Sequence, residues 1–259
     1  SEIMKTVPLI TARAHSDQER VARLAVENNI KAVPIVDANM KLLGVVSSDN
    51  ILNILYHEFL EDTLLSVGVT EFGDSAKGFM KAPIMAHIKT RLPWLVLGLV
   101  GGLLAATVVK QFEGILVEMV ILASFIPSVT YIADAVGAQS QTLFIRTVAL
   151  DSKLPIRRYV FRELLIGSVL AVSLGTLMGV LTFLITQQQI IGVILGVSFV
   201  STIMISTIVG LSISYLLMKL SIDPAIATGP IATVIRDVLN ITVYFLIAGV
   251  ILQNVGLLI

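Results

Sequence analysis

The chain has 259 residues, of which 56% are hydrophobic and 14% charged, and its formal net charge is zero. A mean hydropathy of +0.91 is typical of a polytopic membrane protein, and the balanced charge gives no basic signature for nucleic acid. Without cysteine, the chain has no disulfides, iron–sulfur clusters or thiolate zinc sites.

The histidines exclude further classes of protein. His15, His57 and His87 all precede the first long apolar run, which begins at Leu92. The membrane part therefore has neither the usual ligands for soft metals nor the His-Glu-x-x-His motif of an intramembrane metalloprotease. We predict that the protein is not an enzyme. The position of the first apolar run also predicts no cleavable signal peptide.

Residues 1–66 are predicted to form a small α/β domain. A capping box at Ser16-Asp17-Gln18-Glu19 opens a helix that ends near Asn28. Two strands, at 32–36 and 41–47, are joined by a turn, and Ser48 or Asp49 caps a second helix running toward Leu60. The expected order is extended segment, helix, strand, strand, helix.

Two motifs in this domain carry a resemblance to a known family. Ala-Val-Pro-Ile-Val-Asp at 32–37 and Leu-Leu-Gly-Val-Val-Ser-Ser-Asp at 42–49 resemble a CBS domain over residues 4–57. CBS units normally work in pairs, so we expect the partner upstream of Ser1 or on a second subunit. Adenine nucleotide binding is an alternative that the sequence disfavours, because Asn50 stands where the family's signature aspartate, six residues after Gly44, is expected.

Residues 67–91 form the expected connector, punctuated by glycines and ending in a short amphipathic helix at 79–90. Acidic residues gather around it. A solvated acidic face is one interpretation, and a regulatory site for a divalent cation is the other. The candidate regulatory ligands are Glu58, Glu61, Asp62, Glu71 and Asp74.

Residues 92–259 are expected to form a pore domain of five membrane-spanning helices, since each apolar run is long enough to cross a bilayer. The spans are placed at 92–109, 115–149, 161–186, 190–217 and 226–252. The second is unusually long, and Pro127 is expected to kink or break it. Hydroxyls in the fourth span indicate either close helix packing or a polar cation route.

The positive-inside rule orients these spans. The loop between spans two and three carries Lys153, Arg157, Arg158 and Arg162, whereas the loop around 187–189 carries no charge. We therefore expect a multi-pass protein of the plasma membrane, with the N-terminal domain in the cytoplasm and the C-terminus outside.

Two acids lie inside the predicted spans. Asp237 is near the middle of the fifth, and Asp134 is at a similar predicted depth in the second. A carboxylate there costs about 2.5–3.5 kcal/mol on insertion scales and usually faces a polar pathway or a partner. Oxygen ligands suit a hard cation such as Mg²⁺. Pairing of Asp237 with Arg236 or Arg146 is the competing interpretation.

The membrane region carries a second resemblance. The motifs are Arg91-Leu92-Pro93-Trp94, Phe125-Ile126-Pro127, Val136-Gly137-Ala138-Gln139-Ser140, Asp223-Pro224-Ala225, Gly229-Pro230 and Asp237-Val238-Leu239. In this order they resemble the membrane domain of the MgtE magnesium channels. The resemblance implies a homodimer with a central pore, in which Asp237 is the principal carboxylate.

The same resemblance implies further ligands. Backbone carbonyls of Thr233 and of the segment near Tyr131 and Asp134 would hold the water shell of the ion. Asp134 replaces part of a glycine-rich segment of the family, so we expect it to add charge to the pore or to alter ion choice. Binding of cytosolic Mg²⁺ to the soluble region would close the pore. A CBS-regulated secondary carrier for another divalent cation or solute is the alternative function.

Overall fold

The structure is a computed structural model that describes residues 9–69, 80–150, 154–220, 222 and 229–256. The chain divides into two compact units, which are described separately. The soluble unit comprises residues 1–64 and 71–81, and the membrane unit comprises residues 65–70 and 82–259.

The soluble unit is a three-stranded sheet with two helices. β1 pairs with β2 in parallel, and β2 pairs with β3 antiparallel, in the order β1-β2-β3. Val33 of β2 is fully buried and lies in one apolar cluster with Val21, Ala22 and Ala25 of α1. The elements are β1 (Ala12–Arg13), α1 (Gln18–Glu27), β2 (Ala32–Val36), β3 (Leu42–Ser47) and α2 (Ser48–Ser66).

The predicted order of elements in this unit is confirmed, with two corrections of detail. The N-cap of α1 is Asp17, whose carboxylate accepts a hydrogen bond from the amide of Glu19, while the Ser16 hydroxyl accepts one from the amide of Arg13. α2 continues to Ser66, beyond the expected end near Leu60, because Glu61–Ser66 contains no helix-breaking residue.

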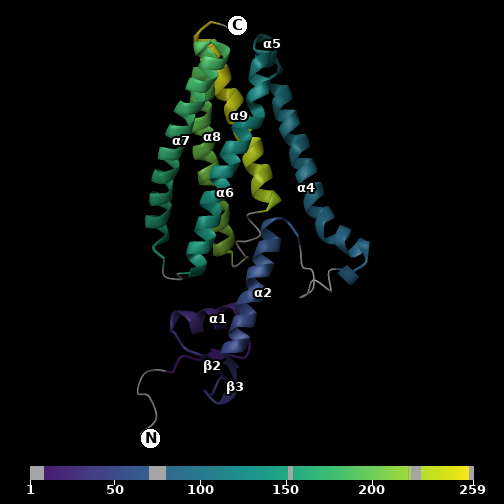
Figure 1. Ribbon diagram of the computed structural model, residues 1–259, viewed down its shortest axis with the longest axis vertical. Coiled ribbons are helices and arrows are strands. Elements are labelled where there is room, and N and C mark those ends of the chain that lie inside the picture. The colour runs from purple at the N-terminus through teal and green to yellow at the C-terminus, as the bar shows by residue number, and fades with distance from the viewer. Residues whose placement is uncertain (1–8, 70–79, 151–153, 221, 223–228, 257–259) are drawn as a thin grey trace. The chain divides into compact units, whose positions relative to one another are not determined.

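The membrane unit contains five helices long and apolar enough to cross a bilayer within the described ranges, as the sequence predicts. Figure 1 shows α6, α7, α8 and α9 side by side, with α4 flanking α9. α8 packs against α6, α7 and α9 and is the most buried of the five. The elements are α4 (Ile84–Gln111), α5 (Glu113–Glu118), a 3₁₀ helix η1 (Val120–Phe125), α6 (Ile126–Leu150), α7 (Ile156–Thr186), α8 (Gln189–Lys219) and α9 (Pro230–Asn254).

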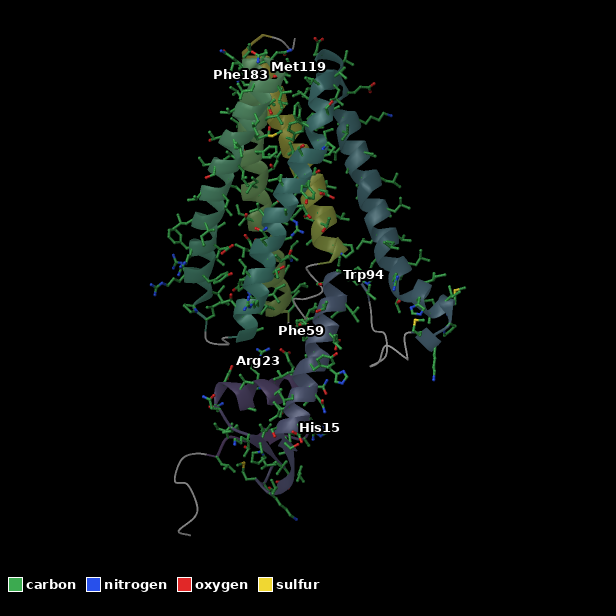
Figure 2. All side chains as sticks on the ribbon, in the orientation of Figure 1. His15, Arg23, Phe59, Trp94, Met119 and Phe183 are labelled. Carbon is green, nitrogen blue, oxygen red and sulfur yellow. The ribbon has the colours of Figure 1, made fainter. Side chains whose placement is uncertain are left out.

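The second predicted span is interrupted, as Pro127 indicates. α5 ends at Glu118, η1 covers Val120–Phe125, and α6 then begins at Ile126. Pro127 thus lies in the first turn of α6, where its missing N–H has no intrahelical partner to lose. In Figure 2, Met119 and Phe183 lie at the same end of the membrane unit, and Trp94 lies toward the other end.

The expectation of a separate amphipathic helix at 79–90 is wrong for its described second half. Residues 84–90 are the first turns of α4, which continues through Pro93 to Gln111 as one helix. Residues 70–79 lie outside the described residues. A continuous helix needs no break at Pro93, because membrane helices tolerate proline when neighbouring groups satisfy the freed carbonyl.

Most hydroxyls of α8 are buried between helices, which favours the packing interpretation. Thr202 and Thr207 donate hydrogen bonds to carbonyls one turn earlier in α8, and Ser206 bonds with Asn240 of α9. Glycine allows the neighbouring backbones to approach. A Cβ added to Gly137 of α6 would lie 2.8 Å from the Ser206 carbonyl oxygen, and one added to Gly210 would lie 2.8 Å from the Gly137 oxygen.

Candidate cation site

Asp237 lies two turns into α9, beside a pocket between α9 and α4. The pocket has a volume of about 390 Å³, and Thr233 and Asp237 supply polar groups to it from α9. Glycines on α4 make room for it, and Gly101 is in such close contact with Val234 that an added Cβ would lie 2.3 Å from its Cγ2 atom. The pocket therefore brings a carboxylate and a hydroxyl of α9 next to a surface of α4 that is made of glycines and leaves space.

The Asp237 carboxylate is not neutralised by its sequence neighbour. Arg236 points to the other side of α9, where its Nε donates to Asp134 at 2.6 Å and its Nη1 donates to Gln141 at 2.7 Å. Consecutive helix residues point about 100° apart, which explains the separation. In the described part of the chain, no side chain forms an ion pair or hydrogen bond with Asp237.

Asp134 lies on α6 with 28% of its side chain exposed, and it is the ion-pair partner of Arg236, which is 1% exposed. The sequence interpretation considered Arg236 only as a partner for Asp237 and did not foresee this pairing. A role for Asp134 as a metal ligand stays a prediction, but its charge is already opposed by a buried guanidinium.

Thr233 and Tyr131 occupy different environments. Thr233 precedes Asp237 by one turn on the same face of α9, so its carbonyl accepts the Asp237 amide in the helix pattern and retains one lone pair. Tyr131 lies on α6 and is 74% exposed. The structure brings Thr233 and Asp237 together at one pocket. The ion-binding roles of the backbone carbonyls of Thr233 and Tyr131 stay predictions.

The acidic candidates of the soluble region form no compact cluster in the described ranges. Glu58, Glu61 and Asp62 share one side of α2 at helical spacing. No group of three or more His, Asp or Glu side chains within the described residues could hold a metal ion. Glu71 and Asp74 lie outside the described residues, so a shared site stays a prediction.

Glu58 makes a pH-dependent contribution to the soluble unit. Burial raises the pKa of its carboxyl, the hydrogen bond from Gln18 lowers it, and repulsion by Glu19 and Glu61 raises it, with a net upward shift. Because the pKa of Glu58 is higher in the folded than in the unfolded state, its contribution to folding stability is present below the unfolded pKa of about 4.3. That contribution is lost as pH rises through the folded pKa.

We therefore expect Glu58→Gln to stabilise the soluble unit at pH 7 and to have no effect at pH 4. The amide oxygen of the variant can still accept from Gln18. The measurement is hydrogen exchange of α1 and α2 amides in the full chain, corrected for intrinsic rates at each pH. Equal protection of the two proteins at pH 7 would contradict this expectation.

Sequence reasoning missed the contact of Arg236 with Gln141. Asp134 and Gln141 are seven residues apart on α6 and so lie on the same helix face, which is a recognisable signal. No local pattern, however, links that face to an arginine on a helix that begins about 100 residues later.

The fold and this site define a multi-pass membrane protein with a small α/β domain and an acidic pocket between two spans. In comparisons with known proteins, a segment of each part matches a family model. Residues 126–247 match the family model of MgtE, described as a divalent cation transporter, and residues 1–57 match the CBS domain. Both matches agree with the resemblances that the sequence motifs predict.

Three bacterial relatives carry the name magnesium transporter MgtE. The chain is 34% identical to that of Bacillus subtilis over 93% of its own length and 52% of the relative's. It is 29% identical to that of Thermus thermophilus, over 98% and 56% of the two lengths. For Enterococcus faecalis the identity is 29%, over 95% and 53%. The chain thus spans about half the length of these relatives, which are named as transporters and not as enzymes.

Proposed function

We propose that the chain transports divalent cations, with Mg²⁺ as the expected ion, along a pathway that passes Asp237. The observation that carries this proposal is a membrane carboxylate that lines a pocket while the adjacent arginine is engaged elsewhere. An uncompensated acid attracts a cation, and a pocket of about 390 Å³ has room for an ion that keeps several waters. The relatives are named magnesium transporters, which supports Mg²⁺ as the transported ion.

We further propose that two copies form the conducting unit. α4 packs mainly against α9 in the single chain and leaves many large apolar side chains exposed, among them Leu95, Leu99 and Leu103. A homodimer with a central pore would place the pockets of two copies around one route. The proposed orientation has the CBS domain in the cytoplasm and the C-terminus outside the plasma membrane.

The direct test is uptake of Mg²⁺ into proteoliposomes that contain the purified chain and a trapped fluorescent indicator. Competition with Ca²⁺, Mn²⁺ and Co²⁺ ranks the ions. The same assay with an imposed proton or sodium gradient separates a channel from a secondary carrier, since only a carrier's uptake follows the gradient of the coupled ion. Absence of uptake for every divalent cation tested would contradict the proposed function.

Regulation by cytosolic Mg²⁺ is the finer part of the proposal. Glu58, Glu61 and Asp62 present three charges on one side of α2, and two such faces in a dimer would repel each other until a cation screened them. A regulatory ion must bind the closed state more tightly than the open one in order to inhibit.

We expect the triple variant Glu58→Gln/Glu61→Gln/Asp62→Asn to lose inhibition by Mg²⁺ on the cytosolic side. Flux is recorded in the full chain across a Mg²⁺ titration. The control is Asp49→Asn, because Asp49 lies on the opposite side of α2 from Glu58 by helical spacing. Unchanged inhibition in the triple variant would show that these acids do not sense the ion.

A further inference from the structure

The buried arginine of α9 has two partners, both on α6. Asp134 accepts from its Nε at 2.6 Å and Gln141 accepts from its Nη1 at 2.7 Å. Because the two acceptors are seven residues apart, they lie on one face of α6 two turns apart. Arg236 therefore connects α9 to α6 by two directed hydrogen bonds, one of which is an ion pair.

This arrangement leaves little freedom to any of the three groups. Arg236 is 1% exposed and Gln141 is fully buried. Within the described residues, the Gln141 Nε2 atom has no hydrogen-bond partner, so the Gln141 side chain gains its stabilisation through the oxygen that accepts from Arg236. A buried guanidinium without its counterion is strongly destabilising, whereas neutral replacement of both partners is often tolerated.

The ion pair also bears on Asp237. Arg236 and Asp237 are adjacent on α9, where helix geometry directs them to different faces, and the two hydrogen bonds to α6 hold the guanidinium on its own face. If Asp134 were neutral, Asp237 would be the nearest acid along the chain for the long, flexible arginine side chain. Its positive charge would then act against a cation in the pocket that Asp237 lines.

We propose that Asp134 is the counterion of Arg236 and not a ligand of the transported ion. On this view, Asp134, Arg236 and Gln141 are positioning residues that keep the Asp237 carboxylate free to bind a cation. The inference rests on the proposed function for its effect on transport, but the ion pair itself is testable without transport.

The experiment is a double-mutant cycle on the full chain with Asp134→Asn, Arg236→Gln and the two combined. Thermal stability in detergent is measured first, followed by the concentration dependence of Mg²⁺ uptake in proteoliposomes. Thr142→Val is the control, since Thr142 lies on α6 with its side chain exposed.

We expect Asp134→Asn to lower stability and to raise the half-saturating Mg²⁺ concentration by about tenfold, the order of effect of one unit charge at short range. The maximal rate should change less. The combined variant should recover both quantities to within about threefold of wild type, because neither charge is left unpaired. If Asp134→Asn is too unstable to be purified, we expect that the combined variant can still be purified as a folded protein.

Two outcomes would overturn the proposal. One is that Asp134→Asn weakens Mg²⁺ affinity equally with and without Arg236→Gln, which would make Asp134 a direct ligand. The other is that the stability losses of the two single variants simply add, or that the combined variant is neither more stable than Asp134→Asn nor saturated at a lower Mg²⁺ concentration. If wild type transports no divalent cation, the proposed function fails, and the stability cycle still decides whether the ion pair exists.

Discussion

Replacement of Asp237 by alanine is expected to abolish uptake of divalent cations while leaving the protein inserted and folded. The carboxylate lines the pocket between α4 and α9 and forms no ion pair or hydrogen bond with a described side chain. Its removal therefore breaks no ion pair or hydrogen bond within the part of the chain that the structure describes. It does remove the attraction between a carboxylate and a divalent cation, which is of the order of a few kcal/mol at the effective dielectric of a protein site.

Asp237→Asn should lose most of the activity as well, since the amide keeps the shape of the side chain but not its charge. A loss of 2 kcal/mol corresponds to roughly a thirtyfold loss of affinity, so we expect at least about that change in the half-saturating concentration. Uptake per inserted molecule is the measurement. Glu113→Gln is the control, because this acid is exposed on the short helix α5. Wild-type flux through Asp237→Ala would remove Asp237 from the pathway.

The second large effect is expected at the crossing of α6 and α8. A Cβ added to Gly137 would lie 2.8 Å from the Ser206 carbonyl oxygen and 2.9 Å from the Ser206 Cβ. These are backbone and near-backbone atoms, so the clash can be relieved only by moving one helix away from the other. Overpacking of this kind costs about 1–3 kcal/mol.

We expect Gly137→Ala to lower the thermal unfolding temperature of the detergent-solubilised protein, and to reduce transport as well. The transport effect follows because α6 carries Asp134 and Gln141, whose bonds to Arg236 depend on helix position. Gly210→Ala should behave in the same way, as its Cβ would meet the Gly137 oxygen at 2.8 Å.

Gly114→Ala is the control, because a Cβ there would meet no atom within 4 Å. If Gly137→Ala melts at the same temperature as Gly114→Ala, the two helices do not cross at the described distance. If stability falls but transport per folded molecule does not, the position of α6 is not coupled to the pathway.

Much of the architecture follows from local properties of the chain. Five apolar runs were enough to predict five spans, because a bilayer demands long helices whose backbone groups bond internally. Pro127 predicted the interruption before α6, since a proline without an N–H fits a first turn better than a helix interior. The continuation of α4 through residues 84–90 was missed, because an amphipathic start and an apolar continuation differ in composition but not in backbone geometry.

The sequence by itself determined that the protein is a polytopic membrane protein with a CBS-like domain. It also determined that Asp237 is a carboxylate within a membrane span, where its insertion costs free energy unless it has a partner or lines a polar pathway. Only the tertiary structure decided which partner each charged group has. Arg236 stands next to Asp237 in the chain, yet it bonds to Asp134, 102 residues away. Helical geometry directs adjacent side chains to different faces, and the packing of α9 against α6 and α4 determines what each face meets.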